Sequence, residues 1–309
     1  MPRLDEQARG IYPISATPFT DDGAIDWESA DRLTDFYLQC KVHGLTLLGM
    51  MGEAQKLTLE EAAAFATRVI RRVDGRVPVV VGVSAGGLAQ MAELTQRVMD
   101  EGAAAVLVAP PPGLRTDDQI FEYVRGVVGA LGPEVPVIYQ DYPPTTNVYL
   151  SSTLFLRMVR AFASMVMLKL EDCPGLDKLT RIRADSGRDS LRRVSVLIGN
   201  GGLYFPQFLQ RGADGAMTGF AFPDVLVQVY ARHVAGDADG AEDLFDAYLP
   251  LVVYEQQPGY GLAVRKEILR RRGAIRSAAT RAPGPRLRPA DAAEVDALLA
   301  RLERRRGGH

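Results

Sequence analysis

The chain has 309 residues, of which 47% are hydrophobic, and its 36 basic residues nearly balance 38 acidic ones. A large core is therefore expected, and a nucleic-acid partner is not, because such proteins usually carry a strongly basic surface. No apolar run reaches the ~18 residues of a membrane span, the N-terminus lacks the apolar stretch of a signal peptide, and the two cysteines are far apart, so we expect a cytoplasmic protein without a membrane partner.

Eight short apolar runs alternate with longer stretches of mixed polarity. The runs are rich in Val, Ile and Leu, as strands buried on both faces of a parallel sheet usually are. They lie at 11–19, 45–50, 77–84, 104–111, 135–142, 166–171, 194–200 and 215–220. The intervening stretches are long enough for crossover helices, two of which should start near Trp27 and near Thr58, where TLEE is a capping-box pattern. Eight such units in series predict a (β/α)8 TIM barrel, with a doubly wound sheet as the alternative.

Helical segments continue beyond the last apolar run. They are expected at 222–235, 239–254, 259–273 and 290–305, with a connector rich in Pro and Arg at 281–289. We therefore predict that residues 1–222 form the barrel through its eighth strand. Residues 223–309 should form the last barrel helix and a C-terminal helical extension within one structural unit.

Glycines and polar residues stand at the ends of several apolar runs, where the active sites of such barrels lie. Gly49 and Gly52 allow a tight turn whose backbone N–H groups could converge on an anion. Only three histidines occur, so lysine, tyrosine or carboxylates are expected to carry any acid–base chemistry. Further candidates in the later runs are Tyr139, Gln140, Tyr142, Gly199, Asn200 and Thr218.

Lys169 is unusual because it lies inside an apolar run, 166–171. A buried ammonium is costly, and the usual response is a lowered pKa, which makes lysine a nucleophile toward carbonyl groups. Side chains alternate along a strand, so Lys169 and Glu171 should share a face, with Glu171 nearer the barrel mouth. That pairing would place an acid–base group beside an imine-forming amine. The alternative is that Lys169 ends a strand at the surface, and that Glu171 is only a structural partner of Lys169 or Lys178.

The order and spacing of these features resemble the dihydrodipicolinate synthase / N-acetylneuraminate lyase family of class I aldolases and dehydratases. The resemblance covers about residues 10–285 and rests on GMMGE (49–53), PVVVGVS (78–84), Lys169 on the sixth strand, Gly199 on the seventh, Gly215–Gly219 and Arg265-Lys266. It implies a 2-oxo acid substrate, an imine formed by Lys169, no metal or organic cofactor, and a homo-oligomer.

Two places depart from the family pattern. The turn carries Met50 and Met51 where the family usually has two threonines, so the backbone donors remain but the hydroxyls do not. In the fifth run, Gln140 stands at the place of the family's proton-relaying tyrosine, and Gln cannot act as an acid or a base. Tyr139 or Tyr142 could replace that tyrosine only if the strand shifted its register, and Tyr142 would face the same way as Gln140.

We therefore expect a Schiff-base-forming lyase that acts on a 2-oxo acid, by dehydration of a 2-oxo-3-deoxy sugar acid or by pyruvate-type aldol cleavage or condensation. The expected catalytic residues are Lys169, Glu171, Tyr139 and Gln140. The expected substrate-binding residues are Gly49, Met50, Met51, Gly52, Glu53, Tyr142, Gly199, Asn200 and Thr218. Two alternatives stay open: a catalytically impaired barrel that binds 2-oxo acids, and a phosphosugar barrel with its phosphate site at 199–202.

Overall fold

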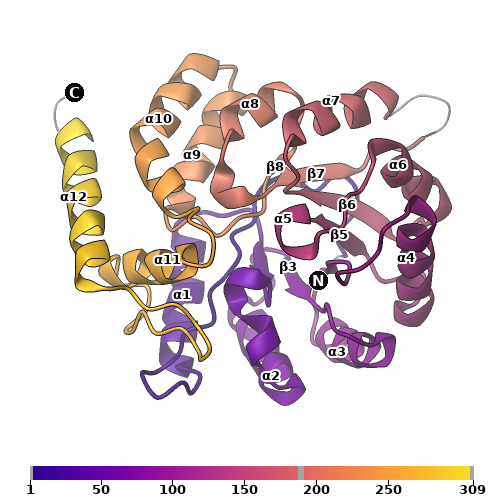
Figure 1. The fold of residues 1–309 in the computed structure, drawn as a ribbon, viewed down its shortest axis with the longest axis horizontal. Coiled ribbons are helices and arrows are strands. Elements are labelled where there is room, and N and C mark those ends of the chain that lie inside the picture. Colours follow the sequence, from indigo (N-terminus) through magenta and orange to yellow (C-terminus); the bar gives the residue numbers. More distant parts are fainter. Residues whose placement is uncertain (1–2, 187–190, 307–309) are drawn as a thin grey trace.

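The computed structural model describes residues 3–186 and 191–306 and contains eight parallel strands in one curled sheet (Figure 1). The strands are β1 (Gly10–Ile11), β2 (Leu45–Leu47), β3 (Val79–Gly82), β4 (Ala105–Val108), β5 (Val137–Asp141), β6 (Met165–Leu170), β7 (Ser195–Ile198) and β8 (Gly215–Ala216). From β2 to β8 each strand pairs with the next one in the sequence, and β8 pairs with β1. The sheet closes where Ile14 bridges Thr46 and the Ser15 N–H donates to the Thr46 carbonyl at 2.8 Å. The predicted (β/α)8 barrel is confirmed, and the doubly wound alternative is wrong.

Two strands are much shorter than the apolar runs that predicted them. Of the run 11–19, only Ile11 lies in a strand, β1, and Pro13 within the run has no N–H to donate to a ladder. In the run 215–220 only Gly215–Ala216 pair with neighbouring strands. The other residues of both runs are nevertheless buried. The apolar runs therefore predicted which residues are buried, but they did not predict how long the strands are.

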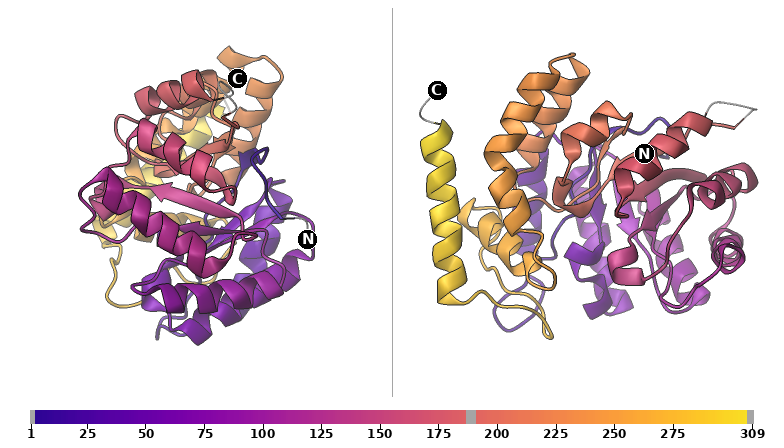
Figure 2. Two further views of the ribbon diagram at one scale, coloured as in Figure 1. Left: turned by 90° about the vertical axis from the view of Figure 1, so that its right-hand side faces the viewer. Right: turned by 45° about the horizontal axis from the view of Figure 1, so that its top comes forward.

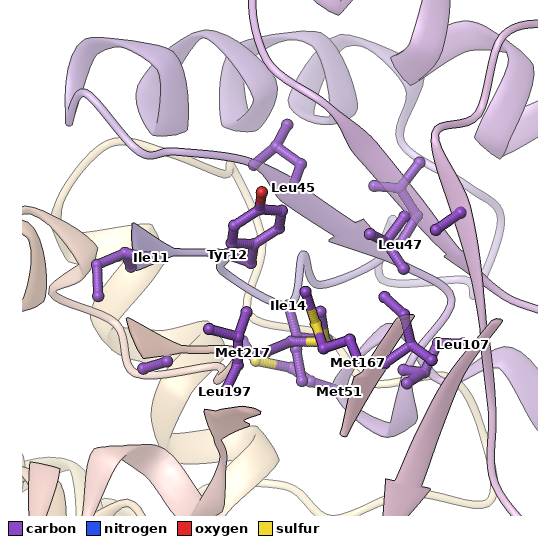
Figure 3. Close-up of a cluster of buried hydrophobic side chains, with 14 of the residues drawn as sticks. Ile11, Tyr12, Ile14, Leu45, Leu47, Met51, Leu107, Met167, Leu197 and Met217 are labelled. Carbon is purple, nitrogen blue, oxygen red and sulfur yellow. The ribbon is translucent and has the colours of Figure 1, made fainter. Parts of the chain in front are cut away.

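Apolar side chains fill the barrel interior (Figure 3). Met167 of β6 and Leu197 of β7 lie there close to Ile14 and Met51, and all four side chains are buried. Met167 precedes Lys169 by two positions, so the two side chains project from the same face of β6. The apolar cluster therefore forms the layer beneath Lys169.

Helices surround the strands (Figures 1 and 2). They are α1 (Trp27–Gln39), α2 (Leu59–Val73), α3 (Leu88–Asp100), α4 (Asp117–Leu131), α6 (Ser152–Ala161), α7 (Gly175–Asp185), α8 (Phe205–Gln210) and α9 (Pro223–Val234), with a short α5 (Pro143–Thr146) after β5. The predicted capping box opens α2: the Glu61 N–H donates to the Thr58 hydroxyl at 3.2 Å, and the Thr58 N–H donates to the Glu61 carboxylate at 3.0 Å. Within the described part of the chain, no helix is long and apolar enough to cross a membrane.

The predicted C-terminal helices are α10 (Ala238–Tyr254), α11 (Gly261–Arg271) and α12 (Pro289–Arg306), with α10 packed between α9 and α12 (Figure 1). Lys266 anchors α11 to the barrel. Its buried ammonium donates to the Thr17 and Ala279 carbonyls at 2.9 and 2.8 Å. It also pairs with the Glu53 carboxylate at 2.5 Å. This anchor holds α11 beside the C-terminal ends of the strands, where the site lies.

Candidate active site

Lys169 lies on β6 inside the barrel. Its backbone pairs with Gln140 on β5 and Leu197 on β7, and its side chain is 2% exposed. Burial lowers the pKa of Lys169; the Glu171 carboxylate opposes this effect and the Arg265 guanidinium adds to it. The alternative that Lys169 ends a strand at the surface is therefore wrong.

Glu171 follows β6 and holds the ammonium of Lys169. Nζ of Lys169 is 2.9 Å from Oε2 of Glu171. The side-chain amide of Gln140 donates to the same oxygen at 2.6 Å, and the Asn200 N–H donates to Oε1 at 3.2 Å. Gly199 leaves room for this carboxylate, because a Cβ there would lie 2.2 Å from Oε1. The predicted common face of Lys169 and Glu171 is confirmed, and the carboxylate is fixed by three donors.

Lys178, the other candidate partner of Glu171, belongs to a separate cluster of charges. Its ammonium is 2.7 Å from a carboxylate oxygen of Asp141 and 2.5 Å from one of Asp172. Burial raises the pKa of Asp141 to about 7, and Lys178 opposes that shift. The Glu171 N–H donates to the Asp141 carbonyl at 2.9 Å, so this cluster fixes the backbone that carries Glu171.

A small inner cavity of about 60 Å³ lies at Lys169. It adjoins an outer cavity of about 660 Å³ at the mouth of the barrel, and Tyr142, Asn200 and Arg265 are among the residues that line both. Eight of the thirteen predicted site residues line the inner cavity: Lys169, Glu171, Gln140, Tyr142, Met50, Met51, Asn200 and Thr218. Among residues 3–186 and 191–306, no cluster of three His, Cys, Asp or Glu side chains could hold a metal ion. The inner cavity thus gathers polar groups from the ends of several strands around one amine.

Tyr139 does not line this cavity. Neighbouring residues on a strand point to opposite faces, so Tyr139 points away from Gln140. Burial, followed by the charges of Asp141 and Tyr123, raises the pKa of Tyr139. Its buried hydroxyl has no hydrogen-bond partner within the described residues. This placement contradicts the expected catalytic role of Tyr139.

Glu53 is held by the C-terminal part of the chain and does not face the substrate cavities. Its carboxylate is 2.5 Å from the Lys266 ammonium and 2.7 Å from that of Lys56, and it accepts a hydrogen bond from the Arg281 N–H at 3.0 Å. Two of these contacts, with Lys266 and with Arg281, dock α11 and the segment after it, and the third is with the nearby Lys56. This corrects the expectation that Glu53 binds substrate.

The three predicted glycines shape the cavity from behind. The Gly52 N–H donates to the Gly49 carbonyl at 2.9 Å and closes the turn, and the Thr17 hydroxyl donates to the Gly52 carbonyl at 2.7 Å. Gly199 packs against Glu171. Neither cavity at Lys169 is lined by Gly49, Gly52 or Gly199 in the part of the chain that the structure describes. Their expected contact with substrate is thus replaced by a structural role.

Comparison with known proteins identifies the family. Residues 7–302 match the Dihydrodipicolinate synthetase family. The chain belongs to this family. The family that the sequence motifs predicted is therefore confirmed.

Several relatives are similar over nearly the whole chain. An L-2-keto-3-deoxyarabonate dehydratase from Azospirillum brasilense is 31% identical over 96% of this chain and 94% of the relative. A crystal structure described as dihydrodipicolinate synthase from Rhodopseudomonas palustris is 50% identical, with a TM-score of 0.95 over 97% of this chain and 100% of that one. A prophage protein of the dihydrodipicolinic acid synthase family from E. coli K12, solved in complex with pyruvate, is 26% identical, with a TM-score of 0.86 over 96% of this chain and 98% of that one.

This member of the dihydrodipicolinate synthetase family departs from the family pattern at Gln140 but keeps a tyrosine nearby. Tyr142 follows Gln140 by two positions and was expected to face the same way. Both residues line the inner cavity, and Tyr142 also lines the outer one. Burial, followed by the negative charge of Glu171, raises the pKa of Tyr142. Its hydroxyl therefore stays protonated at neutral pH and can donate a hydrogen bond.

Two further side chains of the inner cavity, Arg265 and Gln256, were not expected from the sequence. Arg265 lies on α11, and Gln256 lies between α10 and α11. Arg265 donates from Nε to the buried Glu255 carboxylate at 3.1 Å. Burial raises the pKa of Glu255 to about 7, although Arg265 opposes the shift. The only sequence signal was the family-like pair Arg265-Lys266, which does not tell which cation faces the cavity.

Proposed function

We propose that this chain is a Schiff-base-forming lyase that dehydrates a 2-oxo-3-deoxy sugar acid. The proposal depends above all on the buried pair of Lys169 and Glu171, in which an amine with a lowered pKa lies 2.9 Å from a carboxylate. A neutral amine at this place can attack a 2-oxo carbon, and the carboxylate can move protons at the carbons beside it. The similarity to an L-2-keto-3-deoxyarabonate dehydratase supports dehydration as the reaction.

The carboxylate of the substrate is expected to bind at the turn of Met50 and Met51. These residues begin a single 3-10 turn after Gly49, and both line the inner cavity. The first N–H groups of such a turn have no partner within it and can bind an anion. The methionine side chains make this wall of the cavity apolar, so the backbone supplies the polar contacts.

The reaction then proceeds through an imine at C2. The Lys169 ammonium first passes a proton to Glu171, and the neutral amine attacks the 2-oxo carbon. The resulting hydroxyl at C2 takes that proton back from Glu171 and leaves as water, and the protonated imine that remains withdraws electrons from C3. Glu171 takes a proton from C3, which gives a neutral enamine. The enamine expels the C4 hydroxyl, which leaves as water with the proton from Glu171, and a conjugated protonated imine forms. Hydrolysis of this imine releases the product and restores the amine of Lys169.

Gln140 and Tyr142 are expected to assist without acting as bases. The amide of Gln140 donates to Oε2 of Glu171 at 2.6 Å and orients it. The protonated hydroxyl of Tyr142, which lines the cavity, can donate to an oxygen of the substrate. Such fixed donors orient the leaving group.

Aldol cleavage or condensation with a pyruvate-type substrate is the second candidate. The 50% identity to a structure described as dihydrodipicolinate synthase favours it. Both reactions share the imine and the enamine at Lys169, and they differ in whether a C–O or a C–C bond breaks. Gln140 at the place of the relay tyrosine favours dehydration, because Glu171 is then the proton carrier nearest the amine.

Borohydride trapping tests the imine, and product analysis tests the reaction. The protein is reduced in the presence of pyruvate or a panel of 2-oxo-3-deoxy sugar acids, and the adduct is located by intact mass and peptide mapping. We expect an adduct on Lys169, none in Lys169→Met, and a released product that has lost one water. Products of C–C cleavage would favour the aldolase instead, and an adduct without any product would indicate an impaired barrel. No adduct on well-folded protein would overturn the lysine mechanism.

A further inference from the structure

Arg265 presents unused hydrogen-bond donors to the cavity that contains Lys169. It lines both the inner and the outer cavity. Only its Nε–H is engaged, by the Glu255 carboxylate at 3.1 Å, and no other residue among those described accepts from Nη1 or Nη2. A guanidinium has five N–H donors in a planar fork, so most of its capacity is free.

Gln256 supplies a second unused donor at the same place. Its Nε2 is buried and has no hydrogen-bond partner within the described part of the chain. A Cβ built on Gly201, which lines the inner cavity, would lie 1.7 Å from Nε2 of Gln256 and 3.3 Å from Nη2 of Arg265. The Gln256 amide therefore packs against this glycine, with Nη2 of Arg265 beside it, and all three residues line the inner cavity. A buried donor without a partner calls for a physical reason, and a bound ligand is one.

We propose that Arg265 and Gln256 bind a second carboxylate, at the end of the substrate remote from the imine. This inference rests on the proposed function, and it narrows the substrate class to 2-oxo-3-deoxy sugar diacids. A carboxylate only accepts hydrogen bonds, and its two oxygens match the planar fork of a guanidinium, whereas a terminal hydroxyl would leave donors unused. The C1 carboxylate binds at Met50 and Met51, so Arg265 is left for the distal group.

The surroundings of Arg265 are built to hold it in this position. Glu255 is 1% exposed and takes the Nε side of the guanidinium, which turns the Nη side toward the cavity. The neighbouring Lys266 is fixed by Glu53 at 2.5 Å and by two backbone carbonyls, so α11 cannot easily rotate. Arg265 is thus an oriented cation at the junction of the two cavities.

Calorimetric binding of matched 2-oxo acids tests the subsite without any dehydration. The probes are 2-oxoglutarate against 2-oxopentanoate, 2-oxoadipate against 2-oxohexanoate, and pyruvate, which has no distal group. We expect the native protein to bind the diacid of at least one pair about tenfold to hundredfold more tightly, as charge-assisted hydrogen bonds allow. Arg265→Met should abolish that preference, Arg265→Lys should weaken it, and pyruvate binding should stay within a few-fold in both.

Two other variants keep the test independent of misfolding. Gln256→Leu leaves the pair of Arg265 and Glu255 intact and should reduce the preference for the diacid. Arg270→Met removes a guanidinium from the same helix that pairs with Glu267 and lines neither cavity at Lys169, so it should keep the native preference. Equal binding of diacid and monoacid by the native protein would overturn the proposal. So would an Arg265→Met variant that loses pyruvate as strongly as the diacid, since Arg265 would then hold the C1 carboxylate.

Borohydride trapping of the same samples separates this inference from the proposed function. An adduct of pyruvate on Lys169 without any preference for diacids would refute the distal subsite and leave the lysine chemistry intact. A preference for diacids that depends on Arg265, without an adduct on Lys169, would support the subsite and refute the imine.

Discussion

Replacement of Glu171 by Gln tests the central proton transfer. The amide has the shape of the carboxylate and can keep the hydrogen bond from the Asn200 N–H, which is 3.2 Å long in the native protein. It cannot take a proton from C3. Acid–base catalysis by a positioned side chain typically contributes about 10²- to 10⁴-fold, so we expect kcat for dehydration to fall by about that factor, or ~3–5 kcal/mol. Imine formation should persist, because Lys169 is unchanged.

The pH dependence of imine formation separates proton transfer by Glu171 from a purely electrostatic role. The Glu171 carboxylate, 2.9 Å away, raises the pKa of Lys169 against the effect of burial. Its loss therefore lowers that pKa further, and more of the lysine is a free amine at low pH. The acidic limb of imine formation in Glu171→Gln should move to lower pH. Borohydride trapping with pyruvate measures this limb, and steady-state kinetics on the sugar acid measure dehydration.

Asp177→Asn is a suitable control, since it removes a carboxylate from α7, the helix that follows Glu171. Asp177 is half exposed and pairs with Arg181 on the same helix, 3.0 Å away. Its kcat should stay within a few-fold of the native value. If Glu171→Gln loses less than about tenfold in kcat while its pH limb moves, then Glu171 only tunes the lysine and is not the base.

Two further substitutions test the packing of the site and a charge that holds the fold. Gly199→Ala should displace the Glu171 carboxylate, since the new methyl would lie 2.2 Å from Oε1; we expect kcat to fall by about tenfold or more with pyruvate trapping retained, and unchanged kinetics would contradict this packing. Arg276→Met removes the cation beside the buried Asp26. Burial alone would raise the pKa of Asp26, but hydrogen bonds from Arg276 and Ser29 lower it from 3.8 to about 2. A carboxylate with a lowered pKa stabilises the fold above its unfolded value and loses that contribution as the pH falls through its folded value. Because Arg276 is half exposed, we expect urea unfolding of Arg276→Met to show a loss of about 1–2 kcal/mol at pH 7 that shrinks toward pH 2, and an equal loss at both pH values would refute the assignment.

The barrel could be predicted because its strands carry a plain signal. β3 and β4 are buried at every position, as parallel strands covered on both faces must be. Their continuous apolar runs, rich in Val, are the sequence pattern that such strands require. Strand ends were less predictable, since the residues of 215–220 stay buried after pairing stops at Ala216. The capping box at Thr58 and Glu61 was predictable because all its contacts lie within one helical turn.

The inner part of the site was predictable and the outer part was not. Lys169 and Glu171 are two positions apart, and the period of a strand places them on one face. Arg265 and Gln256 come from a segment that folds back over the strand ends, and nothing in their local sequence tells which residues they meet. Glu53 shows the same limit, because the turn motif suggested a substrate contact where the tertiary structure supplies Lys266.

The pair of Lys169 and Glu171 would also keep the buried charges of the inner cavity balanced throughout the proposed reaction. An uncompensated buried charge is strongly unfavourable, whereas a well-placed pair is tolerated. In the proposed reaction the protonated imine keeps the positive charge of Lys169 opposite the Glu171 carboxylate. When Glu171 takes the C3 proton, the imine becomes a neutral enamine, so both charges disappear in one step. Both return when the hydroxyl leaves with that proton. The pair therefore carries no net charge at any stage, and a neutral side chain in place of either partner would leave the other charge uncompensated during part of the cycle.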